Sequence, residues 1–139
     1  MRGKFLHNQI LVSRLEEAFH NLGGTTRIEH RVGHRFIDLF VEWEGWRFVI
    51  EVELTADRVA NDVVKAVAAQ ADLLLIVSPN RRAAAAVNRK LARLSVPSGL
   101  VVWSLPFGPA LQRLANKSRL MTALNISRSS NPKIPGGLL

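Results

Sequence analysis

Residues 35–53 read RFIDLFVEWEGWRFVIEVE, and this stretch decides the fold of the chain. Two runs rich in aromatic and β-branched residues flank Glu44-Gly45, a dipeptide suited to a two-residue hairpin turn. With that turn, the numbers of opposed residues sum to 89, which places aromatic against aromatic and acid against base. Both kinds of pair are favourable across antiparallel strands and support this register independently of any function. The register pairs Trp43 with Trp46 and Glu42 with Arg47.

The same register gathers acidic residues on one face of the hairpin. Asp38 falls opposite Glu51, and Glu53 joins them because residues two apart on a strand share a face. Aspartate is depleted in strand interiors, so its position opposite a glutamate favours a function. The other face is apolar and is expected to pack on the core; it consists of Ile37, Leu39, Val41, Phe48, Ile50 and Val52.

Three carboxylates this close repel one another, and some take up protons unless a cation compensates them. One interpretation is a Mg²⁺ or Mn²⁺ site, because these ions prefer oxygen ligands and are commonly held by one or two carboxylates. The alternative is a solvent-exposed rim that nearby cationic side chains neutralise. The candidates for that neutralisation are Arg35, Arg47, Arg58 and Lys65.

The rest of the chain supplies the helices and strands of an α/β fold. We predict a mixed central sheet flanked by helices in the order α-β-β-β-α-β-α-β, with the antiparallel hairpin first and parallel crossovers after it. Asn8 and Thr55 are expected to cap two of the helices, and Pro79-Asn80 is expected to open a third. Residues 1–124 would form one domain and residues 125–139 a flexible basic tail. The predicted helices cover 8–21, 56–70, 80–94 and 109–124, and the further strands cover 25–30, 72–77 and 100–105.

Polar residues on the first two helices are further candidates for a site. Glu16 lies at the border of the apolar face of its helix and could reach the edge of the sheet, or it could simply face solvent. The second helix carries a polar stripe that begins shortly after the acidic strand. This stripe is either the outer face of an amphipathic helix with an Arg58–Asp62 ion pair, or a set of phosphate and water contacts beside a metal. Its members are Arg58, Asn61, Asp62 and Lys65.

The chain carries a formal net charge of +8 that is unevenly distributed. Residues 1–72 hold nine Lys and Arg against all eleven acids, a net charge of −2, whereas residues 73–139 hold ten Lys and Arg and no acid, a net charge of +10. Such a field favours DNA as the partner, because phosphate contacts release condensed counterions. An anionic membrane and an acidic protein are the alternatives. The third helix is expected to point Arg81, Arg82, Arg89 and Arg93 outward.

Several classes of protein are disfavoured by what the sequence lacks. No apolar run approaches the roughly 20 residues that span a bilayer, and no apolar signal segment follows the start. The chain has no cysteine, and its four histidines lack metal-binding spacing. Because neither a membrane-spanning nor a signal segment is found and cysteine is missing, we expect a cytoplasmic protein without a membrane partner. A P-loop, a dinucleotide loop and a serine-hydrolase elbow are also absent. Trp43 and Trp46 would either stack on bases or stabilise the hairpin.

A helical acid, a strand aspartate, an acid-x-acid strand and a polar-striped helix follow one another along the chain. They are Glu16, Asp38 in RFIDLFV, Glu51-Val52-Glu53 and residues 58–65. This succession, over about residues 9–77, resembles the PD-(D/E)XK nuclease superfamily, and within it the Holliday-junction-resolvase-like or mobile-element nucleases. The resemblance implies a restriction-endonuclease-like fold with an α-β-β-β-α-β core.

The resemblance also implies Mg²⁺- or Mn²⁺-dependent hydrolysis of phosphodiester bonds in duplex or branched DNA. Asp38 and Glu51 would hold the metal, with the Val52 carbonyl as a further ligand, and a metal-bound water would attack phosphorus. Glu53 stands where the family usually has lysine. Lys65, or else Arg58, would then supply the cation from the neighbouring helix, and Glu53 would act as general base or second metal ligand.

The expected function is therefore a metal-dependent DNA endonuclease, and a homodimer is expected because cutting both strands uses two active sites. The alternative is a catalytically inactive DNA-binding or assembly module of the same fold, which the missing lysine favours. A third reading is a structural protein whose acidic face meets a basic partner. The expected catalytic residues are Asp38, Glu51, Glu53, Lys65 and Glu16. The expected DNA contacts are Arg35, Arg58, Asn61, Arg81, Arg82, Arg89 and Arg93.

Overall fold

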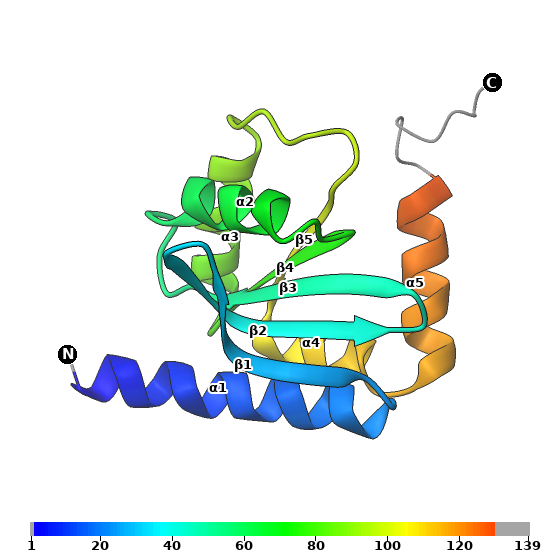
Figure 1. The fold of residues 1–139 in the computed structure, drawn as a ribbon. Helices are drawn as coiled ribbons and strands as arrows, with labels where there is room; N and C mark the ends of the chain where they lie inside the picture. Colours follow the sequence, from blue (N-terminus) through cyan, green and yellow to red (C-terminus); the bar gives the residue numbers. More distant parts are fainter. Residues whose placement is uncertain (1, 130–139) are drawn as a thin grey trace.

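One five-stranded sheet runs through the centre of the computed structural model, which describes residues 2–129, with side chains from Asn8 onward (Figure 1). The strands lie in chain order across the sheet. The second strand pairs antiparallel with both the first and the third, and the third, fourth and fifth pair in parallel. The predicted α/β class with a mixed sheet is therefore confirmed. The strands are β1 (Thr25–Val32), β2 (Arg35–Trp43), β3 (Trp46–Val52), β4 (Leu73–Ser78) and β5 (Val101–Pro106).

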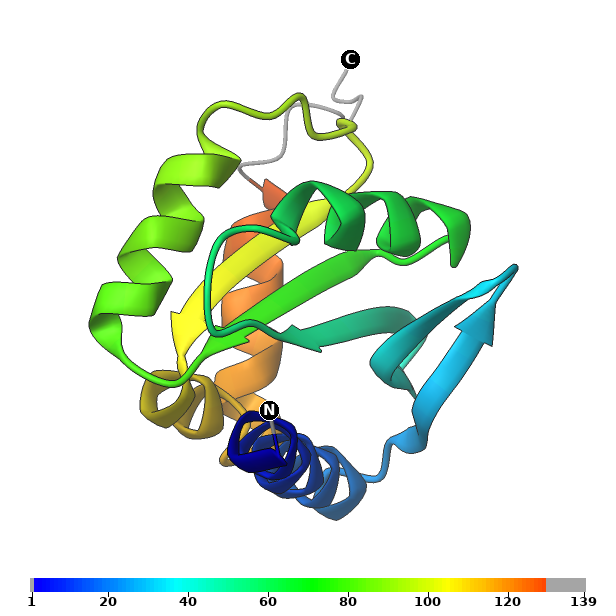
Figure 2. The same cartoon turned by 90° about the vertical axis from the view of Figure 1, so that its left-hand side faces the viewer.

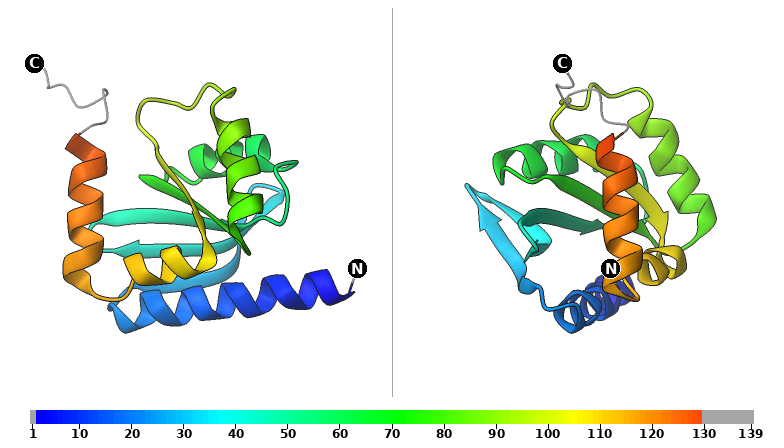
Figure 3. Two further views of the ribbon diagram at one scale, coloured as in Figure 1. Left: turned by 180° about the vertical axis from the view of Figure 1, so that it is seen from behind. Right: turned by 90° about the vertical axis from the view of Figure 1, so that its right-hand side faces the viewer.

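Helices cover both faces of this sheet (Figures 2 and 3). On one face, Leu15 and Phe19 belong to the same buried cluster as Phe48 of β3. On the other face, Val59 and Val87 share a second cluster with strand residues. Because both faces are covered, β4 is buried along its whole length, as its continuous apolar sequence predicts. The first face holds α1 (Arg2–Asn21), α4 (Phe107–Arg113) and α5 (Lys117–Ser129), and the second holds α2 (Val59–Ala68) and α3 (Arg81–Leu91).

The β2–β3 hairpin has the predicted turn and register. Glu44 and Gly45 both have positive φ, 49° and 79°, as a type I′ turn requires. The pairing runs from Trp43 opposite Trp46 to Leu39 opposite Ile50, so opposed residue numbers sum to 89 as predicted. The register therefore places the following residues, Asp38 and Glu51, at the same end of the two strands.

Two predicted helix caps are wrong. Asn8 lies inside α1, because residues 2–7 are already helical and leave no helix start for it to cap. The Thr55 hydroxyl accepts a hydrogen bond from the Asp57 amide (3.3 Å) in a turn, and α2 begins only at Val59. The predicted helix start at Pro79-Asn80 is right, and the structure shows that the Asn80 side chain accepts a hydrogen bond from the Ala83 amide (2.9 Å) at the start of α3.

The C-terminal region forms two helices instead of the single one predicted over 109–124. Asn116 separates α4 from α5 because its side-chain oxygen accepts a hydrogen bond from the Arg119 amide (2.8 Å) and so caps α5. α5 then continues past the predicted domain boundary at residue 124 to Ser129. The rest of the predicted tail, residues 130–139, lies outside the described residues. Among the helices that the structure describes, none combines the length and hydropathy needed to cross a bilayer.

The face of the hairpin that carries the acids is covered rather than open. Phe40 and Val49 share this face, and both are buried in the cluster beneath α2 and α3. The acidic side chains of β3 consequently lie under α2, and the interpretation of Glu51 and Glu53 as a solvent-exposed rim is wrong.

Candidate metal centre

A cavity of about 230 Å³ lies where β2 and β3 end beside the start of α2. Its walls come from four parts of the chain: α1, β2, the end of β3 with the segment after it, and α2. Among the side chains that line it are Asn8, Asp38, Glu51, Glu53, Arg58 and Lys65.

Asp38 stands at the point where the β2–β3 ladder ends. One of its carboxylate oxygens, Oδ2, accepts a hydrogen bond from the Val52 amide (2.9 Å). This bond replaces the next bond of the ladder and fixes the carboxylate beside β3. Asp38 therefore faces the same cavity as Glu51, as the hairpin register predicted.

Glu51 is almost completely buried, with 1% of its surface exposed. Burial, followed by the negative charge of Asp38, raises the pKa of Glu51 to about 8, and the nearby Lys65 ammonium opposes this rise. A carboxyl in this state keeps its proton near neutral pH unless a cation takes the place of that proton.

Lys65 reaches this carboxylate from α2. Its Nζ lies 3.1 Å from Glu51 Oε2, donates a hydrogen bond to the Phe36 carbonyl (2.9 Å) and lies 3.8 Å from Asp62 Oδ1. Lys65 and Asp62 therefore point into the protein, and the reading of the whole polar stripe as an outer helix face is wrong. Of the other two stripe residues, Arg58 is exposed and Asn61 is partly buried.

Asp62 and Glu53 extend the acidic group beneath α2. Asp62 is fully buried and Glu53 is 8% exposed, and one oxygen from each lies within 4.8 Å of the others and of one from Glu51. Burial, the hydrogen-bonded contact with the Glu53 carboxyl and the charges of Glu51 and Glu53 raise the pKa of Asp62 to about 10. Three convergent carboxyl groups of this kind can hold a metal ion.

Asp62 was identified from the sequence only as a member of the helix stripe. The i, i+3 spacing to Lys65 places both residues on one helix face, but spacing alone does not say whether that face is buried. One signal in the sequence is the distribution of valines: Val59, Val63, Val64 and Val67 spread over more than one side of the helix, so the buried side is not obvious. In the structure Val64 and Val67 are exposed.

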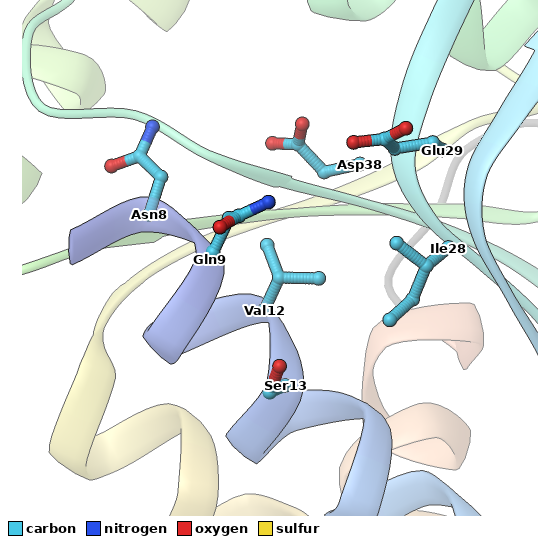
Figure 4. Close-up of a pocket in the computed structure, with 7 residues that line it drawn as sticks. All are labelled: Asn8, Gln9, Val12, Ser13, Ile28, Glu29 and Asp38. Atoms are coloured by element: carbon cyan, nitrogen blue, oxygen red, sulfur yellow. The ribbon is translucent and has the colours of Figure 1, made fainter. Parts of the chain in front are cut away.

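Glu16 is not brought to this group. Its Oε2 accepts a hydrogen bond from the Thr26 hydroxyl (2.9 Å), and it lines a separate hollow beside His20. From the part of α1 whose side chains the structure describes, Asn8 lines the cavity. A neighbouring hollow of about 340 Å³ is lined by Asn8, Asp38 and Glu29 of β1. Figure 4 shows Asp38 between Asn8 and Glu29.

Most of the predicted DNA-contacting arginines lie on the surface. Arg58 lines the cavity, and Arg35 is exposed at the turn between β1 and β2. Arg81 and Arg82 begin α3 directly after β4, so they lie at the sheet edge where the parallel strand β3 also ends. Arg89 and Arg93 are exposed farther along and just after α3.

The two tryptophans at the hairpin tip are structural. Both are buried; the Trp43 indole N–H donates to the Leu22 carbonyl (2.9 Å), and the Arg128 guanidinium lies 3.9 Å from the Trp46 ring centroid. They stabilise the hairpin and offer no exposed ring to a base, which decides between the two readings of this pair.

Protein-family models, curated proteins and solved structures were compared with the chain, and none matches. The functional argument therefore depends on the fold and on the geometry of this acidic group.

Proposed function

We propose that the protein is a metal-dependent DNA endonuclease that hydrolyses phosphodiester bonds in duplex or branched DNA. One observation carries this proposal: Asp38, Glu51 and Lys65 meet at one cavity although they come from β2, β3 and α2. Two carboxylates and one ammonium at the end of a hairpin supply both the ligands for a divalent cation and a positive charge for a phosphate. This arrangement agrees with the expectation drawn from the PD-(D/E)XK resemblance.

The side chains present fit a hard divalent cation such as Mg²⁺ or Mn²⁺. Asp38 and Glu51 would hold it, with the Val52 carbonyl as a further ligand. The fit is supported by the donors themselves, because two carboxylates face one cavity and Glu51 is buried there with Lys65 as its ion-pair partner. When bound, such a cation lowers the pKa of a coordinated water and stabilises the charge that develops on the phosphate.

Side chains of the chain itself supply the remaining functions. The Lys65 ammonium, anchored by the Phe36 carbonyl, stands where it can stabilise negative charge on a phosphate oxygen beside Glu51. Arg58 is exposed at the mouth of the cavity and would neutralise a neighbouring phosphate of the DNA backbone. Lys65 thereby takes over the role for which the family uses the lysine that Glu53 replaces.

Cleavage of supercoiled plasmid and of four-way-junction DNA, with Mg²⁺, Mn²⁺ or EDTA, tests the proposal. We expect cleavage with metal only, and its loss in Asp38→Asn and Glu51→Gln. Glu42→Gln is the matched control, because Glu42 is an exposed acid on the same strand as Asp38. Cleavage that survives in both Asp38→Asn and Glu51→Gln would contradict the assigned site.

A second candidate is an inactive nuclease-like module that binds DNA or assembles with other proteins. The contacts of Lys65 favour it, because its ammonium is already engaged by Glu51 and the Phe36 carbonyl. DNA binding without cleavage under every metal tested would select this function over the first.

A further inference from the structure

The acidic group beneath α2 extends inward, away from Asp38. Its inner part consists of Glu53, directly after β3, and Asp62 on α2, with Glu51 between this part and Asp38. Neither oxygen of Asp62 accepts a hydrogen bond from an amide, hydroxyl or ammonium group among the described residues. The metal proposed above uses neither Glu53 nor Asp62, whose carboxyl oxygens face each other in a contact that a proton or a cation must bridge.

A hydroxyl on the neighbouring strand faces the same group. The Glu53 amide donates to the Val77 carbonyl (2.9 Å), which continues the parallel pairing of Val52 with Val77 by one step. Glu53 and Ser78 are therefore neighbours on adjacent strands, about 5 Å apart at their backbones. Ser78 shares its sheet face with Ile76, which belongs to the cluster beneath α2 and α3.

Ser78 is fully buried, and its Oγ has no hydrogen-bond partner among the residues that the structure describes. A buried hydroxyl without a partner destabilises a protein, so such groups normally contact another polar group, an ordered water or a ligand. Because Ser78 lies beside Glu53, a ligand of the Ser78 hydroxyl would occupy the same space into which Glu53 and Asp62 point.

The charges in this space show which ligand would fit. Asp38 and Glu51 balance the cation proposed above, and Lys65 pairs with Glu51. The inner carboxylates, Glu53 and Asp62, contribute −2 when ionised. A divalent cation balances this charge, and carboxylate and hydroxyl oxygens are the donors that Mg²⁺ and Mn²⁺ prefer.

We propose that Glu53, Asp62 and Ser78 form a second, buried divalent-cation site that joins α2 to β3 and β4. Glu51 lies between this inner site and the cation at Asp38. Because Ser78 and Asp62 have no exposed surface, the inner cation does not meet DNA. It holds in place the helix that carries Lys65, and it does not take part in the hydrolysis.

Titration of the full chain with Mn²⁺, followed by electron paramagnetic resonance of the free ion, tests this site directly. We expect two bound Mn²⁺ per chain. Asp62→Asn and Ser78→Ala should each weaken one of them by about 10- to 100-fold, and Asp38→Asn should weaken only the other. Mg²⁺ should raise the melting temperature of Asp38→Asn but not that of Asp62→Asn.

Two matched controls isolate the effect. Ser104→Ala removes another buried hydroxyl without a described partner, on β5 across Ile76 from Glu51, and Asp57→Asn removes an exposed acid just before α2. Both should leave two Mn²⁺ bound. A single Mn²⁺ in the unmodified chain, or two retained with unchanged affinity in Asp62→Asn, would overturn the inner site.

Ion counting separates this inference from the nuclease proposal. Two bound ions in a protein that cuts no DNA would support the inner site and contradict the nuclease. Cleavage by a protein that binds one ion would support the nuclease and contradict the inner site.

Discussion

At the scale of the residue, the acidic group beneath α2 is a place where protons and cations compete. Burial raises the pKa of both Glu51 and Asp62, and Lys65 counteracts the rise in each. A single ammonium does not neutralise two buried carboxylates, so in the metal-free protein the balance is completed by protons. Any cation that binds must release them, and binding should therefore tighten as the pH rises.

The stability of the metal-free protein should fall as the pH rises. The pKa values of Glu51 and Asp62 are raised from 4.5 and 3.8 to about 8 and about 10 on folding. Between these limits the unfolded chain has lost protons that the folded chain keeps. The free energy of unfolding then decreases with pH, by up to about 1.4 kcal/mol per pH unit for each group. The stability that these protons contribute is complete below about pH 4. It is lost as the pH rises through the folded-state pKa values, about 8 for Glu51 and about 10 for Asp62.

Urea denaturation in EDTA, repeated from pH 4 to 9, measures this profile. Glu51→Gln and Asp62→Asn should each flatten it, whereas Glu42→Gln, an exposed acid, should not. An unmodified protein whose stability rises over this range would contradict the protonated state of these two groups.

Lys65 should be required for cleavage. Lys65→Met keeps much of the side-chain volume but removes the ammonium that faces Glu51, so we expect cleavage to be slower by about 100-fold or more. Lys117→Met is the control, because Lys117 pairs with Glu44 on the surface, at the far end of β3 from Glu53. Rates measured at saturating Mg²⁺ on the same junction DNA decide the point. An unchanged rate in Lys65→Met would assign the role to another group, Glu53 first.

At the level of secondary structure, the hairpin and α2 each position part of the site. The type I′ turn and the aromatic pairs set the register that brings Asp38 beside Glu51. α2 then lies across the end of β3 and brings in Asp62 and Lys65. The site is thus assembled from a local element, the hairpin, and a packing contact between elements.

Gly45→Ala tests the turn. Gly45 has a φ of 79°, and an added Cβ would meet nothing within 4 Å, so the penalty is one of backbone conformation alone. We expect a loss of about 1 kcal/mol in the free energy of unfolding. Gly108→Ala is the matched control: its Cβ also has open space, but its φ is not positive and it lies in α4, where alanine should be neutral or stabilising. Equal effects of the two substitutions, measured by urea denaturation, would show that the turn conformation does not limit stability.

At the scale of the whole molecule, charge is separated along the chain and across the sheet. The acids of β3 are buried at the end of the sheet where Arg58, Arg81 and Arg82 are exposed. A polyanion that approached this end would meet positive charge first and the acidic cavity behind it. DNA is therefore expected to bind here rather than at the hairpin tip.

Neutralising Arg81 and Arg82 together to Gln should weaken DNA binding and lower the slope of log affinity against log salt by about 1 to 2. The matched pair is Lys117→Gln with Arg119→Gln, which removes the same charge beside the hairpin tip. Fluorescence anisotropy of labelled duplex at several salt concentrations compares them. Equal slopes for the two double variants would place the DNA elsewhere.

Much of the fold could be predicted from the sequence because it depends on local rules. Glu44-Gly45 predicted its turn, the residues around it predicted the register, and Asn80 predicted the start of α3. Thr55 and Asn8 failed as caps because a capping side chain alone does not show where the flanking chain turns helical.

The hairpin and the proximity of Asp38 to Glu51 could be predicted from the sequence, because they follow from period-two alternation and turn geometry between near neighbours. The mixed sheet could be predicted because helices that alternate with strands form parallel crossovers. Which side of α2 is buried, the presence of Asn8 rather than Glu16 at the cavity, and the approach of Asp62 to Glu53 depend on tertiary packing. The physical reason is that helical periodicity defines faces but not their partners. A helix with Val59 and Val63 on one side and Val64 and Val67 on another is oriented by what it packs against.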